Sequence, residues 1–494
     1  MSFRIQTAAA RLARPAAALL LLSLAACADL SGIESQARLR EPASLGLAAG
    51  ERSASPLAAD WWREFGDAQL DALVAQALEG NPGLRLAQAR LARARAVTEV
   101  ADAALLPQLN ASLDLTRQKY TAHGAVPAPL AGAIRDSGTA QLSLGWELDF
   151  FGKYRAALDA ALGQARAAEA EVQAARLLLA SNVARQYIQL ARLQAQLGVA
   201  ERTLAQREQT LGLVRERVEA GLDTQLELRQ SEGSLPEARQ QLEALREQVA
   251  LTRHGLAALV GEPAVAQKLQ PAALASLKGG LPAGQIPADL LGRRADVAAA
   301  RWRVEAAGHE VANAKAQFYP NINLVAFAGL SSIGLGRLLE AGSQQWGVGP
   351  ALRLPIFEAG RLRAKLRGKA ADHDAAVESY NAAVLEAVRE TADQLASAQS
   401  IARQQAEQAA AQAAAESAYE IAVQRYRAGL GNYLQVLSAE TGVLQQRRQA
   451  VDLAARALDT RVGLIRALGG GWQADADAQA RGGWQADADA QARL

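Results

Sequence analysis

The sequence predicts a mainly α-helical protein that carries a few membrane-spanning β-strands and contains two copies of one large unit. Two long segments, residues 153–235 and 361–494, contain no proline, and four short tracts alternate between apolar and polar residues. The two halves of the chain also align with each other at fixed offsets. The chain has one cysteine and a formal net charge of +2, so we expect neither disulfides nor a nucleic-acid-binding surface.

The N-terminus is typical of a bacterial lipoprotein signal peptide. Arginines precede an apolar run over residues 16–24, which is too short to span a membrane as a helix. The small residues that follow end at Cys27, so we expect cleavage after residue 26, a covalent lipid on Cys27 and a lipidated segment over residues 27–60. The alternative is an ordinary secretory signal in which Cys27 is incidental. Residue 28 is alanine and not aspartate, which favours delivery to the outer membrane.

The two proline-free segments predict long helices. Residues 152–220 alone would form a helix about 100 Å long at 1.5 Å per residue. Leu204, Leu211 and Val214 lie in a stripe with the spacing of a coiled-coil seam, which needs a partner helix along its length. Pro236 follows Ser234, a residue suited to helix capping, so we expect the helix to kink or restart there.

The alternating tracts predict β-strands at about residues 107–117, 139–150, 320–330 and 345–357. Each has the length and the pattern of a transmembrane strand, although four strands of a soluble, half-buried sheet are the alternative. Four strands cannot close a barrel in lipid, where open edges leave backbone groups unpaired. A trimer would supply a 12-stranded barrel with a water-filled interior, and the polar residues of every strand favour it over a packed eight-stranded dimer.

An internal repeat relates the halves of the chain. Residues 101–113 align with 314–326, and Gly221-Leu222 aligns with Gly429-Leu430. We therefore expect a first repeat over residues 61–265 and a second over residues 266–472, each with helices, two strands and a long coiled-coil hairpin. The residues 473–494 contain a tandem copy of the segment that begins at Gly470, and we expect this tail to be disordered and without function.

Several stretches resemble a known family. They are Trp61–Asp67 (WWREFGD), Trp146–Lys153 (WELDFFGK), Leu354–Arg361 (LPIFEAGR) and, as the most specific match, Arg425–Leu434 (RYRAGLGNYL). They resemble the TolC superfamily of outer-membrane efflux channels, in its OprM/NodT-like lipoprotein branch, over about residues 60–472. The resemblance implies a trimer in which a 12-stranded outer-membrane β-barrel is continuous with a long periplasmic α-helical barrel.

The resemblance also implies a function and partners. A chain of this family is a passive conduit that exports drugs or other toxic small molecules across the periplasm and the outer membrane. Its partners are a periplasmic membrane-fusion adaptor protein and an inner-membrane pump of the RND type, and outer-membrane lipid surrounds it. Two alternatives remain at this stage. One is a lipid-anchored periplasmic coiled-coil scaffold without a pore, and the other is an outer-membrane duct for peptide or protein secretion.

The turns between the long helices are the candidate site. Each breaks a coiled coil with a glycine suited to a helix C-cap, and the resemblance implies that the adaptor docks there; a plain turn without a partner is the alternative. The expected docking residues are Gly221, Leu222, Asp223, Thr224, Gly429, Leu430, Gly431 and Asn432. Charge pairs between neighbouring coils would close the tube, several acting together because exposed pairs are weak. The gate candidates are Asp223, Arg215, Arg217, Arg425 and Arg427.

Two departures from the family pattern stand out. Gly431 occupies a position where relatives carry aspartate, so we expect an acidic ring at the tip to be built from Asp223 alone. Residues 28–40 lack the Gly-Pro-x-Tyr-x-x-Pro segment that often follows the lipidated cysteine, so the sequence provides no support for the N-terminal wrap that this segment forms.

The sequence offers little support for catalysis. The histidines lie far apart, without the spacing of metal ligands; they are His123, His254, His309 and His373. Nucleophile motifs, phosphate loops and dinucleotide fingerprints do not occur in a supporting context. We therefore expect no enzyme activity, no metal and no cofactor other than the lipid on Cys27.

Overall fold

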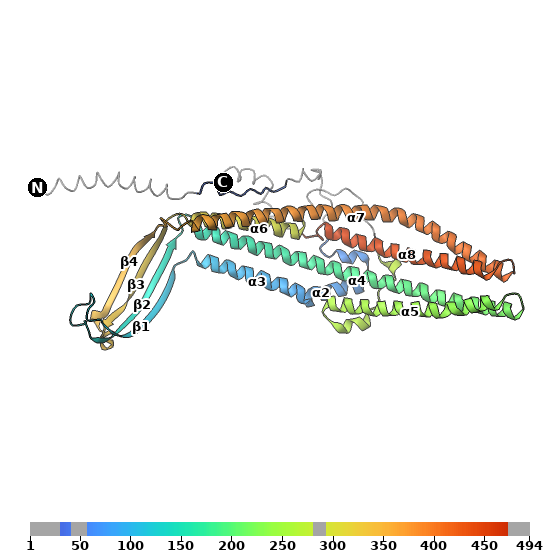
Figure 1. The fold of residues 1–494 in the computed structure, drawn as a ribbon, viewed down its shortest axis with the longest axis horizontal. Helices are drawn as coiled ribbons and strands as arrows, with labels where there is room; N and C mark the ends of the chain where they lie inside the picture. The colour runs from blue at the N-terminus through green and yellow to red at the C-terminus, as the bar shows by residue number, and fades with distance from the viewer. Residues whose placement is uncertain (1–29, 41–56, 280–292, 473–494) are drawn as a thin grey trace. The chain divides into compact units, whose positions relative to one another are not determined.

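The computed structural model describes residues 30–40, 57–279 and 293–472 (Figure 1). The predicted signal peptide, the candidate lipidation site Cys27 and the duplicated tail lie outside these residues. The chain divides into two compact units. The first consists of Leu91–Ala168, Ala300–Tyr380 and the N-terminal residues up to Leu39, and the second contains the rest. Each unit takes segments from both sequence repeats, because strands of both repeats pair in one sheet.

Within residues 30–40, 57–279 and 293–472, no helix combines the length and the apolar character needed to cross a bilayer.

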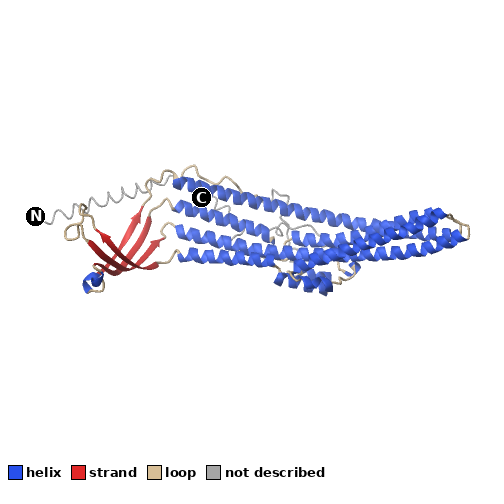
Figure 2. Cartoon of the chain, turned by 60° about the horizontal axis from the view of Figure 1, so that its bottom comes forward, coloured by secondary structure: helices blue, strands red, loops and turns tan. Residues whose placement is uncertain are grey.

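The first unit contains a single antiparallel sheet with the strand order β1-β2-β3-β4 (Figures 1 and 2). The strands are β1 (Gln108–Lys119), β2 (Ile134–Leu148), β3 (Asn321–Ile333) and β4 (Gln344–Arg353). Two boundaries differ from the sequence prediction by more than three residues. β2 begins at Ile134 and not at residue 139, because it pairs with the whole of β1 as far as Lys119. β4 ends at Arg353 and not at residue 357, because Pro355 has no N–H to continue the ladder.

The strand register separates the sheet into two chemically different faces. On the apolar face, paired residues are leucine, alanine, valine and tryptophan; they include Leu109, Leu113, Leu115, Leu142, Leu144, Trp146, Leu324, Ala326, Ala328, Trp346 and Val348. The polar face carries mainly hydroxyl, amide and glycine residues, including Asn110, Ser112, Thr139, Gln141, Ser143, Asn321, Asn323 and Gln345. Leu113 and Trp346 on the apolar face are 65% and 78% exposed in the single chain. An apolar surface of this extent is the mark of an interaction surface.

Each strand pair lies between two helices in the sequence. α3 (Pro82–Ala103) leads into β1 and α4 (Lys153–Glu219) follows β2, while α6 (Ala295–Ala316) leads into β3 and α7 (Arg361–Arg427) follows β4. In the first unit, a small core joins α6 and α7 to the N-terminal segment. Its members are Ile33, Ala314, Phe318, Leu362, Leu366 and Ala370.

The second unit contains the long coiled-coil hairpins. α4 pairs with α5 (Gln225–Val260), and α7 with α8 (Tyr433–Ala467) (Figure 1). Leu211 and Val214 of the predicted stripe are buried, and so are Leu242 and Val249 of α5, as coiled-coil packing requires.

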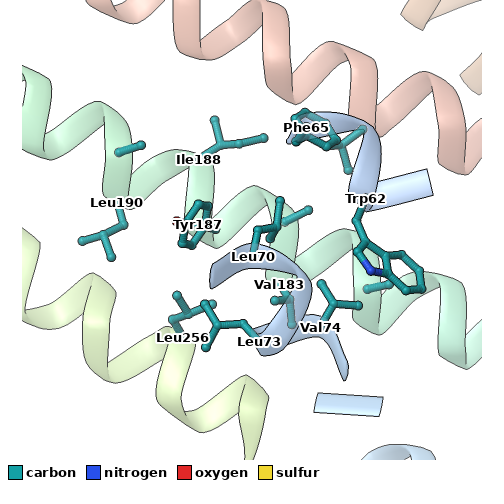
Figure 3. Packing of buried hydrophobic residues seen from close by; sticks show 14 of the residues in the cluster. Trp62, Phe65, Leu70, Leu73, Val74, Val183, Tyr187, Ile188, Leu190 and Leu256 are labelled. Carbon is teal, nitrogen blue, oxygen red and sulfur yellow. The ribbon is translucent and has the colours of Figure 1, made fainter. Parts of the chain in front are cut away.

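A larger core gathers around α4 in the second unit. It receives side chains from α5, from α2 (Ala68–Gly80), from α8 and from the short 3-10 helices η2 (Trp61–Phe65), η3 (Pro263–Lys268) and η4 (Leu274–Ser276). Figure 3 shows Tyr187 and Leu190 of α4 packed among Leu70, Leu73 and Leu256. The Tyr187 hydroxyl donates to Asp67 Oδ2 at 2.5 Å, and Asp67 also caps α2. The motif at residues 61–67 therefore fastens α2 to the hairpin.

The prediction that a new helix starts at Pro236 is wrong. α5 is one continuous helix through Pro236, and the Ser234 hydroxyl donates to the carbonyl of Ser231 inside the helix and does not cap a new one. Proline removes one backbone hydrogen bond, with the carbonyl of Glu232 losing its partner. Burial of Ala238 and Leu242 just beyond it keeps the helix in the seam and offsets that loss.

Candidate functional site

The long helices α4 and α7 end in the same backbone motif. Gly221 and Gly429 have φ values of 73° and 74°, in the left-handed region where glycine is free of strain. The N–H of Leu222 donates to the carbonyl of Arg217 at 2.8 Å, and that of Leu430 to the carbonyl of Arg425 at 2.8 Å. These are Schellman caps, and the glycine required by the sequence pattern is what permits them.

The following helices begin almost at once. Thr224 caps α5 and forms a capping box with Glu227, while the Asn432 side chain accepts from the N–H of Gln435 at 3.0 Å and caps α8. A C-cap and an N-cap separated by two residues leave the chain little freedom. Each turn is therefore a short, fixed tip between two antiparallel helices.

Leucines project from both tips. Leu222 and Leu430 are 65% and 70% exposed, and Leu226 and Leu434, one helical turn later, are 62% and 64% exposed. These positions are equivalent in the two sequence repeats. Exposed leucines that cluster at a rigid tip form an apolar surface suited to a protein partner.

A partly buried polar cluster joins the two tips. Arg217 Nε lies 2.9 Å from Asp223 Oδ2 and its Nη2 lies 3.3 Å from Oδ1, a bidentate pair whose side chains are only 12% and 10% exposed. Arg217 Nη1 also donates to the carbonyl of Tyr426 at 3.0 Å. The Tyr426 hydroxyl donates to Asp223 Oδ2, and the guanidinium lies 4.6 Å from the centre of the Tyr426 ring. The cluster Arg217–Asp223–Tyr426 thus links α4 and its turn to the end of α7.

The other predicted gate residues lie outside this cluster. Arg425 donates to the carbonyl of Leu430 at 3.1 Å, within its own turn. Arg215 pairs loosely with Glu232 at 3.8 Å, and both Arg215 and Arg427 are exposed. Of the five charged candidates, the structure brings together Arg217 and Asp223.

Sequence reasoning missed Tyr426. This side chain is fully buried, and its ring centre lies 6.2 Å from that of Tyr433. Tyr426 stands between two arginines in the motif at residues 425–434, and a tyrosine at a buried seam position requires a partner for its hydroxyl. The need for a hydroxyl partner was the signal that the sequence offered. The partner of Tyr426, however, is Asp223, which lies 203 residues away in the sequence.

The contacts within the cluster shift the pKa values of its three side chains. Burial opposes the charged form of Asp223, but hydrogen bonds from Arg217 and Tyr426 outweigh it and lower the pKa of Asp223. Burial and the hydrogen bond to Asp223 raise the pKa of Tyr426, and the same carboxylate raises the pKa of Arg217. All three groups therefore keep their hydrogen-bonding states at neutral pH.

The described residues contain no group of three His, Cys, Asp or Glu side chains that could hold a metal ion. The side chain of His373, on α7, forms a hydrogen bond with Ser35: the Nδ1 and Oγ atoms are 2.9 Å apart.

The fold and the tips define a class of protein: a membrane channel subunit in which strand pairs with one apolar and one polar face alternate with long helical hairpins. Residues 73–262 and 286–470 match the family model described as "Outer membrane efflux protein". The chain belongs to this family, which confirms the resemblance to the TolC superfamily and the prediction of an outer-membrane efflux channel.

Named relatives agree with this assignment. The chain is 40% identical over 358 residues to the fusaric acid resistance protein FusA of Burkholderia cepacia, covering 70% of this chain and 67% of that protein. It is 35% identical over 439 residues to the pyoverdine export outer membrane protein OpmQ of Pseudomonas aeruginosa, covering 88% and 92%.

Solved structures show the same fold. The outer membrane protein VceC of Vibrio cholerae superposes with a TM-score of 0.79 at 36% identity, covering 84% of this chain and all of that one (100%). The outer-membrane channel OprN superposes with a TM-score of 0.80 at 28% identity, covering 90% and 98%. OprN is described as an outer-membrane channel, in agreement with the family assignment.

The ionisation of Asp223 predicts how the tips respond to acid. A carboxyl whose pKa is lower in the folded cluster than in an exposed chain contributes stability above its unfolded pKa, about 3.9, and loses it as the pH falls through the folded pKa. We expect the conductance of the channel in planar bilayers to be the same at pH 7 and pH 5 and to rise only below about pH 4. The Asp223→Asn variant should lack this acid response, and an increase already between pH 7 and pH 5 would contradict the assignment.

Proposed function

We propose that the chain assembles as a homotrimer whose strands form one 12-stranded barrel continuous with an α-helical barrel. β1 and β4 are the edges of the sheet in the described residues, and their outward backbone groups need partners in lipid. Three copies of a four-stranded sheet supply the predicted strand number, and the polar face suits a water-filled interior. The apolar face favours this channel over a scaffold without a pore.

The N-terminal segment supports a lipid anchor at Cys27. Ile33 is 7% exposed in the small core with Leu362 and Phe318, next to the junction of strands and helices. Asp374 Oδ1 accepts from the N–H groups of Gln36 and Ala37, each at 3.0 Å. The segment thus lies along α7 even though the family's proline-rich motif is absent.

Chain length then limits where a lipid could enter the membrane. Ile33 lies six positions after Cys27, a stretch that spans at most about 20 Å when the chain is extended. A lipid on Cys27 would therefore enter the bilayer close to the strand–helix junction. This is the periplasmic side of a sheet whose opposite end faces the exterior.

The tips serve docking and closure in this proposal. The adaptor binds Leu222, Leu226, Leu430 and Leu434, which are exposed on rigid turns. The cluster Arg217–Asp223–Tyr426 holds the hairpins together in the closed state, and an adaptor that binds the open state more tightly shifts the population. An inner-membrane RND-type pump supplies energy and selectivity.

The cargo class follows from the named relatives as a proposal. FusA is named for fusaric acid resistance, OpmQ for pyoverdine export and MdtP for multidrug resistance. We infer that small organic molecules delivered by the pump are the substrates. No observation favours peptide or protein secretion.

The cluster at the tips provides the main experiment. Replacing Arg217 by Ala and Tyr426 by Phe together removes both donors to Asp223, so we expect a several-fold higher single-channel conductance of the trimer in planar bilayers. Arg427→Ala is the matched control, since Arg427 is an exposed arginine on the same helix end and should leave conductance unchanged. Equal conductance in the double variant and the control would show that the cluster does not close the channel.

The anchor is tested by Cys27→Ser. We expect loss of palmitate incorporation, while the barrel still retains the protein in the outer-membrane fraction because the sheet spans the bilayer without the lipid. Incorporation of radiolabelled palmitate and fractionation of the membranes measure both effects. Labelling that persists in the variant would rule out Cys27 as the lipidated residue.

A further inference from the structure

The connection between β3 and β4 folds back over the apolar face of the sheet. It spans residues 334–343 and contains the short 3-10 helices η6 (Leu335–Arg337) and η7 (Ala341–Ser343), drawn beside the strand ends in Figure 2. A Cβ atom added at Gly138 of β2 would lie 3.0 Å from Leu335 Cδ2, 3.1 Å from Leu338 Cδ2 and 3.2 Å from Leu115 Cδ2. Leu115 is the cross-strand partner of Gly138 and belongs to the apolar face. Leu335 and Leu338 therefore lie on that face as well.

Hydrogen bonds fix this fold-back. The N–H of Gly334 donates to the carbonyl of Asp136 at 2.6 Å, and Ser332 Oγ donates to the carbonyl of Gly334 at 3.0 Å. Ser343 Oγ donates to the carbonyl of Arg337 at 2.7 Å and closes the connection on itself. The position of the leucines over Gly138 is thus set by the backbone.

Part of this leucine surface remains uncovered. Leu339 is 86% exposed and Leu335 is 44% exposed. The connection between β1 and β2, at the same end of the sheet, is different: its Val126 and Leu130 are partly buried. The exposed leucines are therefore a property of the β3–β4 connection.

The charged residues beside the β3–β4 connection indicate how deep in the membrane its leucines would lie. Arg117 and Asp136 form an ion pair at 3.7 Å, and they are cross-strand partners one step beyond Leu115 and Gly138 on the same face. Leu335 and Leu338, which lie over Gly138, are on the inner side of this pair, toward the middle of the sheet. Charged residues belong at the level of lipid headgroups, and apolar side chains below them contact acyl chains.

We propose that Leu335, Leu338 and Leu339 form a leucine clasp that inserts between the acyl chains of the outer leaflet. The clasp rests on the proposed placement of the sheet across the membrane and extends its lipid-contacting surface. A second copy of the chain is the less suitable occupant, because it would pair along the free edges of β1 and β4, whereas Leu335 and Leu338 cover Gly138 of the interior strand β2. The clasp also ties the strand pair of one repeat to that of the other on the lipid side.

Site-specific fluorescence tests the clasp. Single cysteines replace Leu339 in the clasp, Leu113 in the middle of the apolar face, and Ala125 in the exposed part of the β1–β2 connection. Each is labelled with the environment-sensitive dye NBD in the full-length mature protein, and the parent chain reports any labelling at Cys27. Proteoliposomes of phosphatidylcholine then contain either acyl-chain spin labels or aqueous iodide as the quencher.

The expected result is that the dye at residue 339 matches the dye at residue 113: blue-shifted emission that acyl-chain spin labels quench and iodide does not. The dye at residue 125 should be quenched by iodide. Iodide quenching at 339, or protection from both quenchers as in a contact between copies, would overturn the clasp. If the dye at residue 113 is also accessible to iodide, the membrane placement of the sheet fails instead.

A second variant moves the clasp without removing its leucines. Gly138→Val fills the space under Leu335 and Leu338, so the dye at residue 339 should lose quenching by the lipid spin labels and gain quenching by iodide. Ala140→Val, at the next apolar-face position of β2, is the matched control and should change neither. Unchanged lipid quenching at residue 339 in the Gly138→Val protein would contradict the docking that the clasp requires.

Discussion

The unpaired edges of the four-stranded sheet are the constraint on which the rest of the structure depends. In lipid, a backbone N–H or C=O without a partner costs several kcal/mol, and one chain leaves both β1 and β4 open. The strand register then decides which way the sheet faces, because most apolar side chains of the paired positions lie on one side, with Val325, Phe327 and Ile333 as exceptions on the polar face. The proposed trimer, with a wet interior and a lipid-facing exterior, would satisfy both requirements.

The two repeats share a plan but differ in detail where function is expected. Both long helices end in a Schellman cap followed at once by a capped helix. The first repeat contributes Arg217 and Asp223 to the partly buried cluster, whereas the second contributes Tyr426. Gly431, at the position equivalent to Asp223, has no charge to offer. The two hairpins of one chain are therefore joined by an asymmetric contact, and in the proposed closed state Asp223 would supply the carboxylate of this cluster.

Much of the architecture could be predicted from the sequence, because periodicity reports directly on burial. The period of two located the strands, and the glycines of the turns located the tips. Pro236 misled because local propensity favours a break, while burial in the coiled-coil seam keeps α5 continuous. Spacing alone could not identify Arg217 as the partner of Asp223, because the turn after α4 is what brings Asp223 back to Arg217. Nor could it identify Tyr426, whose hydroxyl partner is distant in the sequence. Those contacts are set by tertiary packing.

The central claim is that open sheet edges make this chain a hollow trimer. Electron microscopy of the mature protein purified in detergent tests it most directly. The account predicts particles with threefold symmetry, a central channel and a helical shaft of about 100 Å, the length of a helix of nearly 70 residues at 1.5 Å per residue. Monomers, or solid rods without a channel, would contradict it and leave a lipid-anchored coiled-coil scaffold as the better description.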